Sequence, residues 1–207
     1  MTELVVATTN KGKLREIKEL LKGLDLNITS LADYPDAPKI AEDGKTFEEN
    51  ALKKAATIAL YTKKLTLGED SGIEVKVLNG APGIHSARFS GAHATDGKNN
   101  LKLLRSLKKV PSKKRQARYR CYAALVDGHG IIDVVNGQCS GVITRRARGN
   151  NGFGYDPYFL IVRYNKTFGE LDPALKAKVS HRARALKKVR TILQKYLRRG
   201  TARRISV

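Results

Sequence analysis

Hydrophobic positions in the first thirty residues alternate between short β-branched runs and helical repeats. Leu4–Thr8 is an apolar, β-branched run, after which leucine and isoleucine recur at helical spacing from about Lys13 to Lys22, where Gly23 ends the pattern. Runs of the first kind are typical of buried strands, and repeats of the second kind place apolar side chains on one face of a helix. The pattern predicts a strand over 4–8, a helix over 13–22 and a strand over 26–30.

The most regular helical pattern in the chain begins at Thr46. This residue is a good N-cap, Glu49 follows three positions later as in a capping box, and small or apolar residues form one face as far as Tyr61. After this helix, residues 65–68 and 73–78 have the composition of strands. Between them, Glu69-Asp70-Ser71-Gly72 is interpreted as an acidic turn.

The pattern from residue 98 onward predicts three strands between two helices. A basic helix over 98–109, with its leucines inside, is ended by Pro111. Strands over 117–126 and 131–142 flank a hairpin signal at 127–130, another strand follows over 158–162, and leucines at helical spacing mark a last helix from about 186 to 197. We predict an α/β fold: an elongated mixed sheet with flanking helices and two lobes around a central cleft, the lobes meeting at 109–115.

Composition narrows the class of protein. A chain of 207 residues with 41% hydrophobic residues fits one globular domain, here residues 1–200, followed by a basic tail over 201–207 that we expect to be disordered. The sequence has neither an apolar run of about 18 residues nor the start of a signal peptide, so we expect a cytoplasmic protein that is not bound to a membrane. Cys121 and Cys139 lack metal-binding spacing and are expected to be reduced and partly buried.

The net charge of +21 is concentrated in two segments. Residues 98–120 carry ten basic residues and 176–207 carry twelve, neither segment has an acidic residue, and the rest of the chain is almost neutral. Solvated helix faces and a frayed tail explain this charge most simply, and an RNA-binding surface is the alternative. Both interpretations allow attraction of a small polyanion.

A glycine-bracketed aromatic residue is the strongest sign of a binding site. Asn151-Gly152-Phe153-Gly154-Tyr155-Asp156-Pro157 combines an aromatic ring, a carboxylate and two glycines, which let a ligand approach the backbone closely. The segment fits a loop that stacks on a flat ligand, although a tight turn between strands would use similar residues.

Three other segments carry candidate chemistry. One polar segment joins a strand to a helix and could bind a phosphate at the helix N-terminus, or could simply cap the helix. It consists of Thr8, Thr9, Asn10, Lys11, Gly12 and Lys13. The pairs Glu42-Asp43 and Glu69-Asp70 offer hard oxygen ligands for Mg²⁺ if the fold brings them together. Such a set suits metal-assisted hydrolysis of a phosphoanhydride. His181-Arg182 could donate to the edge of a base, or Ser180 could cap a helix there.

Taken together, these segments resemble one known family. The chain is similar to the inosine/xanthosine triphosphate pyrophosphatases, which hydrolyse non-standard purine nucleoside triphosphates to the monophosphate and pyrophosphate. The resemblance runs from Leu4 to about Leu197 and rests on segments in the family's order: Thr8-x-Asn10-x-x-Lys13, Glu42-x-Gly44-x-Thr46-Phe47-x-Glu49-Asn50-Ala51, Lys54-Ala55, Asp70-Ser71-Gly72, Pro82-Gly83-Ile84-x-Ser86-Ala87-Arg88, Gly152 to Pro157, and Ser180-His181-Arg182.

The resemblance implies a role for each matching residue. Residues 8–13 would hold the triphosphate with Lys54 and Ser71 nearby, Glu42 and Asp70 would contact Mg²⁺, and Asp70 would be the base for the attacking water. Phe153 would stack on the purine, while Gly154, Tyr155 and Asp156 shape the nucleoside pocket and Lys176, His181 and Arg182 complete it. The resemblance also implies a homodimer, a nucleotide in the central cleft and no requirement for nucleic acid.

Two positions depart from the family's commonest pattern, and two other functions stay open. Glu69 stands where an aspartate usually precedes Asp70, and Asn150-Asn151 replaces a more glycine-rich entry to the Phe153 loop, where either asparagine could adopt a left-handed conformation. The alternatives are a related pyrophosphatase for modified pyrimidine nucleotides and a basic RNA-binding protein.

Overall fold

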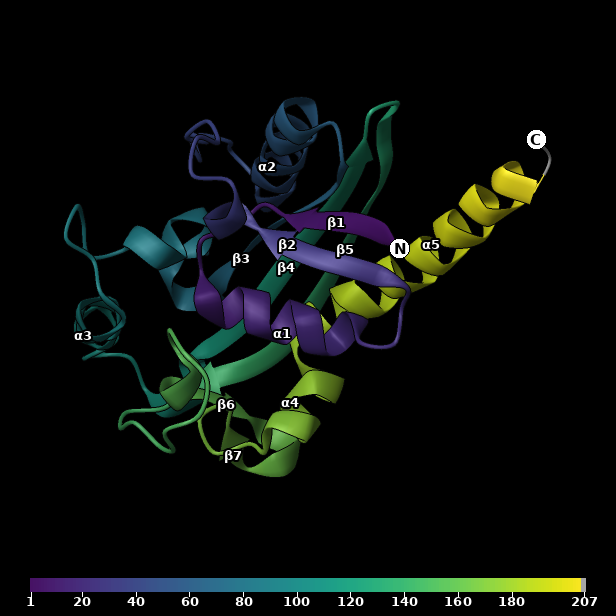
Figure 1. Ribbon diagram of the computed structural model, residues 1–207. Helices are drawn as coiled ribbons and strands as arrows, with labels where there is room; N and C mark the ends of the chain where they lie inside the picture. Colours follow the sequence, from purple (N-terminus) through teal and green to yellow (C-terminus); the bar gives the residue numbers. More distant parts are fainter. Residues whose placement is uncertain (206–207) are drawn as a thin grey trace. The chain divides into compact units, whose positions relative to one another are not determined.

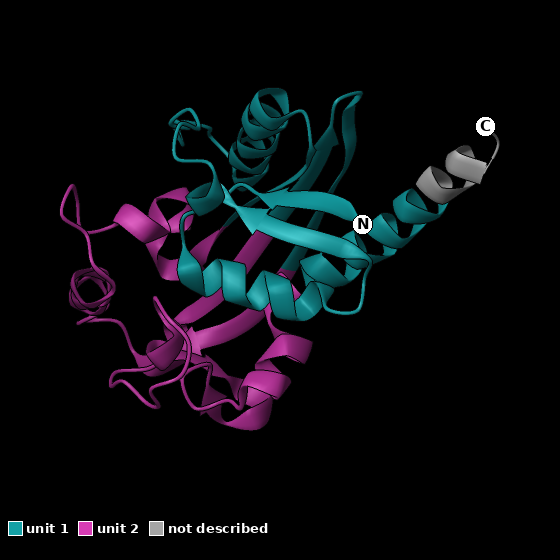
Figure 2. Ribbon diagram, viewed as in Figure 1, with its two compact units in different colours: residues 1–70, 122–137, 184–207 teal, residues 71–121, 138–183 magenta. Residues whose placement is uncertain are grey.

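The computed structural model describes residues 1–205, and their side chains as far as residue 198. The chain forms two compact units, shown in different colours in Figure 2. Unit 1 comprises Met1–Asp70, Tyr122–Gly137 and the chain from Arg184 onward, and unit 2 comprises Ser71–Cys121 and Gln138–Ala183. Two units were predicted, but the boundary predicted at 109–115 is wrong, because that segment lies inside unit 2.

A mixed seven-stranded sheet with accompanying helices confirms the predicted α/β class (Figure 1). The strands are β1 (Thr2–Val6), β2 (Leu26–Ser30), β3 (Leu65–Val75), β4 (Gln116–Asp127), β5 (Gly130–Ile143), β6 (Phe159–Ile161) and β7 (Lys166–Thr167). The α-helices are α1 (Lys11–Leu21), α2 (Phe47–Thr62), α3 (Asp96–Ser106), α4 (Pro173–Val179) and α5 (His181–Ile205). The strand order is β2-β1-β3-β4-β5-β6-β7; β1 is parallel to β2 and β3, and β6 is antiparallel to β5 and β7.

The clearest difference from the predicted elements lies at the acidic segment. β3 continues without a turn from Leu65 to Val75, and within it Glu69 and Asp70 are only 2% and 6% exposed. The two predicted strands are therefore one, and a short 3-10 helix, Lys76–Leu78, replaces the end of the second. The basic helix also begins earlier than predicted, because Thr95 caps it.

Unit 1 is built around aliphatic side chains from both ends of the chain. Leu4 and Val6 of β1 belong to one buried cluster with Ile17 of α1 and with Leu186 and Val189 of α5. A second cluster consists mainly of alanines, through which α2 packs closely against β4. Close packing on small residues brings the backbone of α2 near the sheet, which matters for the side chains that this helix carries.

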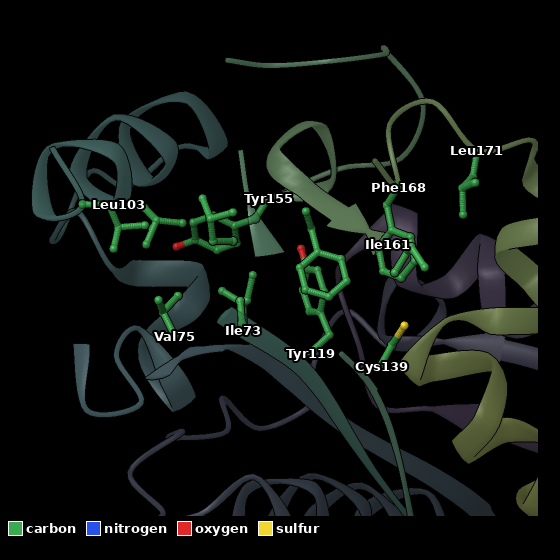
Figure 3. Packing of buried hydrophobic residues seen from close by; sticks show 13 residues of the cluster. Ile73, Val75, Leu103, Tyr119, Cys139, Tyr155, Ile161, Phe168 and Leu171 are labelled. Carbon is green, nitrogen blue, oxygen red and sulfur yellow. The ribbon is translucent and has the colours of Figure 1, made fainter. Parts of the chain in front are cut away.

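Unit 2 has an aromatic core (Figure 3). The ring of Tyr119 meets Phe159 edge-on at a centroid distance of 4.8 Å and stacks on Phe168 at 5.7 Å. Cys121 and Cys139 form no disulfide, as expected, and both are buried rather than partly buried. Such aromatic pairs add specific geometry to apolar burial.

Two further expectations from the sequence concern membrane spans and the C-terminal tail. Of the helices that the structure describes, none is both long and apolar enough to cross a lipid bilayer. Helix α5 continues through residues 201–205 of the predicted basic tail, and residues 206–207 lie outside the described residues.

Candidate functional site

The predicted phosphate loop joins β1 to α1 in unit 1. Asn10 is the N-cap of α1: its side-chain oxygen accepts a hydrogen bond from the Lys13 backbone N–H at 3.0 Å, and its own N–H donates to the Thr8 hydroxyl at 3.1 Å. Thr9 and Lys11 are exposed. The capping interpretation is therefore confirmed, and the same geometry leaves a helix N-terminus whose dipole favours an anion.

Lys13 extends from α1 to the buried part of β3. Its ammonium lies 2.8 Å from Oε2 of Glu69, whose side chain is fully buried. A buried carboxylate requires such a partner, because burial without one would be costly. Glu69 thus fixes the position of the Lys13 ammonium in unit 1, a contact that the sequence alone did not indicate.

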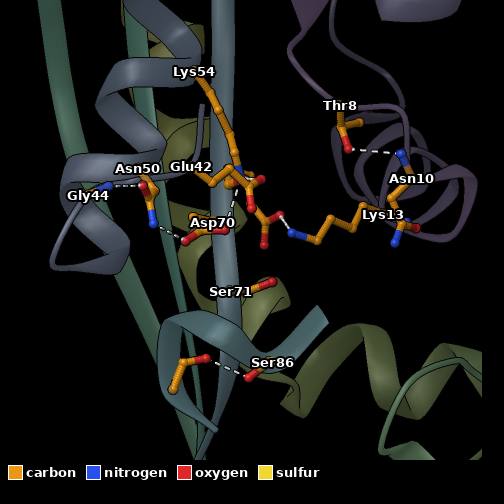
Figure 4. Close-up of polar contacts among 12 residues, drawn as sticks. Thr8, Asn10, Lys13, Glu42, Gly44, Asn50, Lys54, Asp70, Ser71 and Ser86 are labelled. Carbon is orange, nitrogen blue, oxygen red and sulfur yellow. Dashed lines mark hydrogen bonds and ion pairs between the residues drawn. The ribbon is translucent and has the colours of Figure 1, made fainter. Parts of the chain in front are cut away.

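Lys54 of α2 brings the predicted acidic residues of unit 1 together (Figure 4). Its ammonium lies 2.5 Å from Oε1 of Glu42 and 2.9 Å from Oδ1 of Asp70, and it also donates to the Glu69 carbonyl at 3.3 Å. Burial raises the pKa of the Asp70 carboxyl, although Lys54 and Lys13 lower it. Burial opposes the charge on Lys54, but the carboxylates of Asp70 and Glu42 outweigh it and raise the pKa of the lysine.

The start of α2 holds the other oxygen of Asp70. The Asn50 side-chain amide donates to Oδ2 of Asp70 at 3.2 Å and accepts a hydrogen bond from the Gly44 backbone N–H at 2.9 Å. Thr46 caps this helix as predicted, accepting from the Glu49 N–H, whereas the Glu49 carboxylate accepts from the N–H of Lys45 rather than closing the expected box. The cap therefore fixes the segment that carries Glu42 and Gly44.

Gly68 allows α2 to approach β3 at the level of the acidic residues. A Cβ atom at this position would lie 2.2 Å from the Ala51 carbonyl oxygen and 2.6 Å from the Ala55 nitrogen. No side chain fits there. The reach of Lys54 and Asn50 to Asp70 thus depends on a glycine two residues earlier in the strand.

The donor set of this cluster bears on the predicted metal. Among the described residues, no three histidine, cysteine, aspartate or glutamate side chains come together in a way that could hold an ion. Glu42 and Asp70 nevertheless converge on one cation, the Lys54 ammonium. Mg²⁺ is commonly held by one or two carboxylates with waters and substrate phosphates supplying the other ligands, so the two carboxylates fit that ion.

In unit 2, the Phe153 loop is organised around the buried carboxylate of Asp156. Oδ2 of Asp156 accepts a hydrogen bond from the Phe153 backbone N–H at 2.9 Å and pairs with the Lys176 ammonium at 2.7 Å, while the Tyr119 hydroxyl donates to Oδ1 at 3.4 Å. A Cβ atom on Gly152, whose φ is +81°, would lie 2.0 Å from the same Oδ2. The loop is thus a built structure and not only a turn.

The glycines, and not the asparagines, take the unusual backbone conformations of this loop. Positive φ angles occur at Gly149, Gly152 and Gly154, and neither Asn150 nor Asn151 has one, so the expectation of a left-handed asparagine is wrong. Asn151 instead holds the loop from its side, donating from its backbone N–H to Gly169 and from its side-chain amide to Leu171. The Gly154 N–H donates to the Asp96 carboxylate at 2.7 Å.

Cations surround the half-buried Phe153 ring. The Lys176 ammonium lies 5.2 Å and the Arg182 guanidinium 5.6 Å from the ring centroid. His181 lies flat against Tyr119, with a centroid distance of 4.4 Å and an interplanar angle of 6°. Ser180 caps α5 by accepting from the Ala183 N–H at 3.1 Å, so the capping interpretation of this segment holds together with its placement beside Phe153.

The structure groups the predicted site residues into two sets. Unit 1 contains the loop from Thr8 to Lys13 and joins Glu42 and Asp70 through Lys54, and unit 2 joins Phe153 and Asp156 with Lys176 and Arg182. Ser71, predicted to lie on the phosphates, belongs to unit 2, and its hydroxyl accepts from Arg182 at 2.9 Å. Tyr155, predicted to shape a pocket, is buried and donates its hydroxyl to the Ser86 carbonyl at 2.8 Å.

Sequence reasoning missed four residues that hold these clusters. Asn50 and Ser86 lie inside the motifs that carried the resemblance, so their positions were marked but their contacts were not. Ser86 accepts from the Ile73 N–H at 2.9 Å and so ties β3 to the segment after it. Tyr119 and Asp96 gave no local signal, because each acts through a partner more than 30 positions away.

These two clusters define a class of protein. A helix N-terminus beside a lysine–carboxylate cluster is suited to binding phosphate groups. An aromatic ring flanked by cations is suited to binding a flat, electron-rich ring. Together the two clusters are typical of a nucleotide-binding α/β protein. The chain belongs to the Ham1 family, whose model matches residues 4–192, and the resemblance seen in the sequence is thereby confirmed.

Named relatives and solved structures agree with this assignment. The chain is 47% identical to the dITP/XTP pyrophosphatase of Desulforamulus reducens, over 93% of this chain and 96% of that protein, and 51% identical to that of Geobacter sulfurreducens, over 90% and 94%. It is also similar to a solved HAM1 protein from Coxiella burnetii, with a TM-score of 0.85 and 38% identity over 94% of this chain and all of the other.

Proposed function

We propose that this chain hydrolyses the non-standard purine nucleoside triphosphates ITP, dITP and XTP to the monophosphate and pyrophosphate. The observation that carries the proposal is the cluster of Asp70, Lys54 and Glu42 in unit 1, with two carboxylates on one buried ammonium. The names of relatives that match almost the full chain support the same reaction.

In this reaction Asp70 serves as the base. Water attacks the α-phosphorus, the bond to the bridging oxygen between the α- and β-phosphates breaks, and pyrophosphate leaves with that oxygen. Asp70 accepts the proton of the water, and Asn50 and Lys54 hold its two oxygens in place. Glu42 and Asp70 would hold Mg²⁺, which supplies neutralisation of phosphate charge when bound. Lys13 and the N-terminus of α1 bind phosphate oxygens.

The side chains around Phe153 supply selectivity for the base. Lys176 and Arg182 only donate hydrogen bonds, so they favour a 6-oxo purine and lose their partner when a 6-amino group takes its place. A buried donor left without an acceptor costs about 1–3 kcal/mol, so a few such contacts separate ITP and XTP from ATP. Phe153 contributes stacking that any purine would share.

The test is pyrophosphate release from ITP, dITP, XTP, GTP, ATP and a modified pyrimidine triphosphate, each with Mg²⁺ and with EDTA. We expect release from ITP, dITP and XTP with Mg²⁺, and none after chelation. Asp70→Asn should lower kcat by about 10²–10⁴-fold, as the loss of a general base does. Asp25→Asn, the same change at an exposed position, is the control. Equal rates on ATP and ITP, or full activity of Asp70→Asn, would contradict the proposal.

The resemblance also implies a homodimer, and we retain this as part of the proposal. Sedimentation velocity of the full chain measures it directly. A monomer at all concentrations would remove the dimer without affecting the assignment of the reaction.

A further inference from the structure

One basic surface of unit 2 has no part in the proposed reaction. It consists of six exposed side chains on two segments, one before β4 and one after β5: Lys108, Lys109, Lys113, Lys114, Arg145 and Arg146. We call this set the basic platform. Its lysines belong to the segment 98–120, whose charge the sequence analysis assigned to solvated helix faces or, alternatively, to an RNA-binding surface.

Hydrogen bonds hold the two segments of the platform side by side. The Ile143 backbone N–H donates to the Arg115 carbonyl at 2.9 Å, and the Arg145 guanidinium donates to the Ser112 hydroxyl at 3.4 Å and to the Val110 carbonyl at 3.5 Å. Lys113 and Lys114 lie in a short 3-10 turn between these contacts. The charges are therefore gathered by the fold and not only by the sequence.

Arg115 fixes the lysine-bearing turn from beneath. Its guanidinium is buried and donates to the carbonyls of Leu107 at 2.7 Å and Val110 at 3.0 Å. Burial and then the nearby charge of Arg145 lower its pKa. A buried arginine that satisfies carbonyls makes the platform a fixed surface, which reduces the entropy lost on binding a partner.

No carboxylate of unit 2 neutralises the platform. Unit 2 contains twenty basic and five acidic residues. All five acids have partners elsewhere: Glu74 pairs with Arg118 and Arg120, Asp156 with Lys176, Glu170 with Arg148, Asp96 accepts from Gly154, and Asp172 caps α4. Within the described residues, no ion pair includes a platform side chain. Like charges held together without carboxylate partners raise the free energy, and a bound polyanion would reduce that cost.

We propose that the basic platform binds the phosphodiester backbone of nucleic acid without reading its sequence. Exposed lysines and arginines on a fixed surface match a row of phosphates, and their contacts carry no base information. The exposed large hydrophobic residues among the described side chains lie outside the two segments, so the platform has no apolar residue to insert into a lipid surface. It also lacks an exposed aromatic residue on which bases would stack, which favours backbone contacts alone.

The test compares two variants of equal charge by fluorescence anisotropy with labelled single-stranded RNA, single-stranded DNA and duplex DNA. The platform variant carries Lys108→Gln, Lys109→Gln, Lys113→Gln and Lys114→Gln. The control carries Lys18→Gln, Lys22→Gln, Lys39→Gln and Lys187→Gln, all exposed positions of unit 1. Thermal unfolding of both variants and pyrophosphate release show whether each is folded, since none of these lysines belongs to the proposed catalytic or binding residues.

For the unchanged chain we expect binding to single strands that weakens steeply with salt. Each phosphate contact contributes about 0.7 to the slope of log K against log salt, so four lysines contribute about 3, or roughly 50-fold between about 50 and 200 mM. The platform variant should lose this part of the slope while the control keeps it. RNA and DNA should bind alike.

Three results would overturn the proposal. Equal losses in the two variants would mean that only net charge matters, and unaltered binding in the platform variant would place the nucleic acid elsewhere. Binding to vesicles containing phosphatidylserine but not to any nucleic acid would assign the surface to a membrane. Each result is independent of pyrophosphate release, so the platform and the proposed reaction can fail separately.

Discussion

At the scale of single residues, Lys54 has two neighbours that would repel each other without it. Its ammonium separates the carboxylates of Glu42 and Asp70, and the lysine and Asp70 are both buried. Removing one partner of a buried ion pair leaves the other charge without compensation. The resulting loss of stability is usually larger than the net stabilisation that the pair provided. Lys54 thus contributes to the stability of unit 1 as well as to the chemistry proposed for it.

Replacement of Lys54 tests both contributions. Lys54→Met should lower the free energy of unfolding by about 3–5 kcal/mol in EDTA, because two carboxylates then converge without a cation. Mg²⁺ should restore part of this loss and should stabilise the variant more than the unchanged chain. Urea unfolding with and without Mg²⁺ measures both effects.

The exposed neighbour of Lys54 provides a matched control. Lys53 pairs with Asp43 at 2.6 Å, but both side chains are exposed, by 41% and 68%. Lys53→Met should therefore change stability little, with or without the metal. A Lys54→Met protein that unfolds like Lys53→Met would show that the two carboxylates do not depend on the lysine.

At the scale of elements, the approach of α2 to β3 determines whether the unit 1 cluster can form. Gly68→Ala would place a methyl group within 2.2 Å of a backbone oxygen of the helix. We expect a loss of about 1–3 kcal/mol in the free energy of unfolding from this overpacking. Activity should fall further than stability alone explains, because Lys54 and Asn50 would move away from Asp70.

A glycine in open space serves for comparison. Gly97 lies in the first turn of α3, and an added Cβ atom would meet nothing within 4 Å. Gly97→Ala should be neutral or slightly stabilising, as alanine is in a helix. If both substitutions gave the same change in the denaturation midpoint, close packing of α2 on β3 would not be the cause.

The elements also show where the sequence was informative. The structure confirms three predictions that rest on local sequence patterns: the helical period of α2, the hairpin between β4 and β5, and strand β2. The acidic segment of β3 appeared to be a turn because Glu69 and Asp70 are polar, and the compensation for their burial comes from Lys13 and Lys54 on other elements. Helix α4 was missed even though Asp172-Pro173 is a good helix start, because the helix is only seven residues long.

The same difference between local patterns and tertiary contacts applies to the candidate site. The motifs located Glu42, Asp70 and Phe153 by residue type and spacing, and these residues do lie among the predicted partners within their own units. The partners that fix them could not be predicted, since Asn50, Tyr119 and Asp96 act through contacts between distant segments. Local patterns indicate candidate residues for the proposed chemistry, whereas the residues that support them depend on tertiary packing.

At the scale of the whole molecule, positive charge is distributed unequally. Unit 2 has an excess of fifteen basic residues, whereas unit 1 has twenty basic and fourteen acidic residues. Fields of this kind attract small polyanions over distances of about a Debye length, which is roughly 10 Å at 0.1 M salt. A nucleoside triphosphate would therefore meet the protein faster at low salt.

This attraction predicts a kinetic effect of salt on the proposed reaction. Between about 20 and 200 mM KCl, kcat/KM for ITP should fall by at least about 10-fold, mainly through KM, because encounter is screened while the chemical step is not. Steady-state rates at constant pH and Mg²⁺ measure it. A kcat/KM that does not change with salt would mean that the net charge of +21 has no part in substrate capture.

The division into two units has a consequence for how such a protein can change over generations. The chain passes between the units after Asp70, after Cys121, after Gly137 and after Ala183, so unit 1 takes segments from both ends and the middle of the gene product. A single recombination event exchanges one contiguous stretch of coding sequence, and no contiguous stretch encodes unit 1. A single exchange of this kind therefore cannot transfer, duplicate or remove one whole unit without also affecting the other.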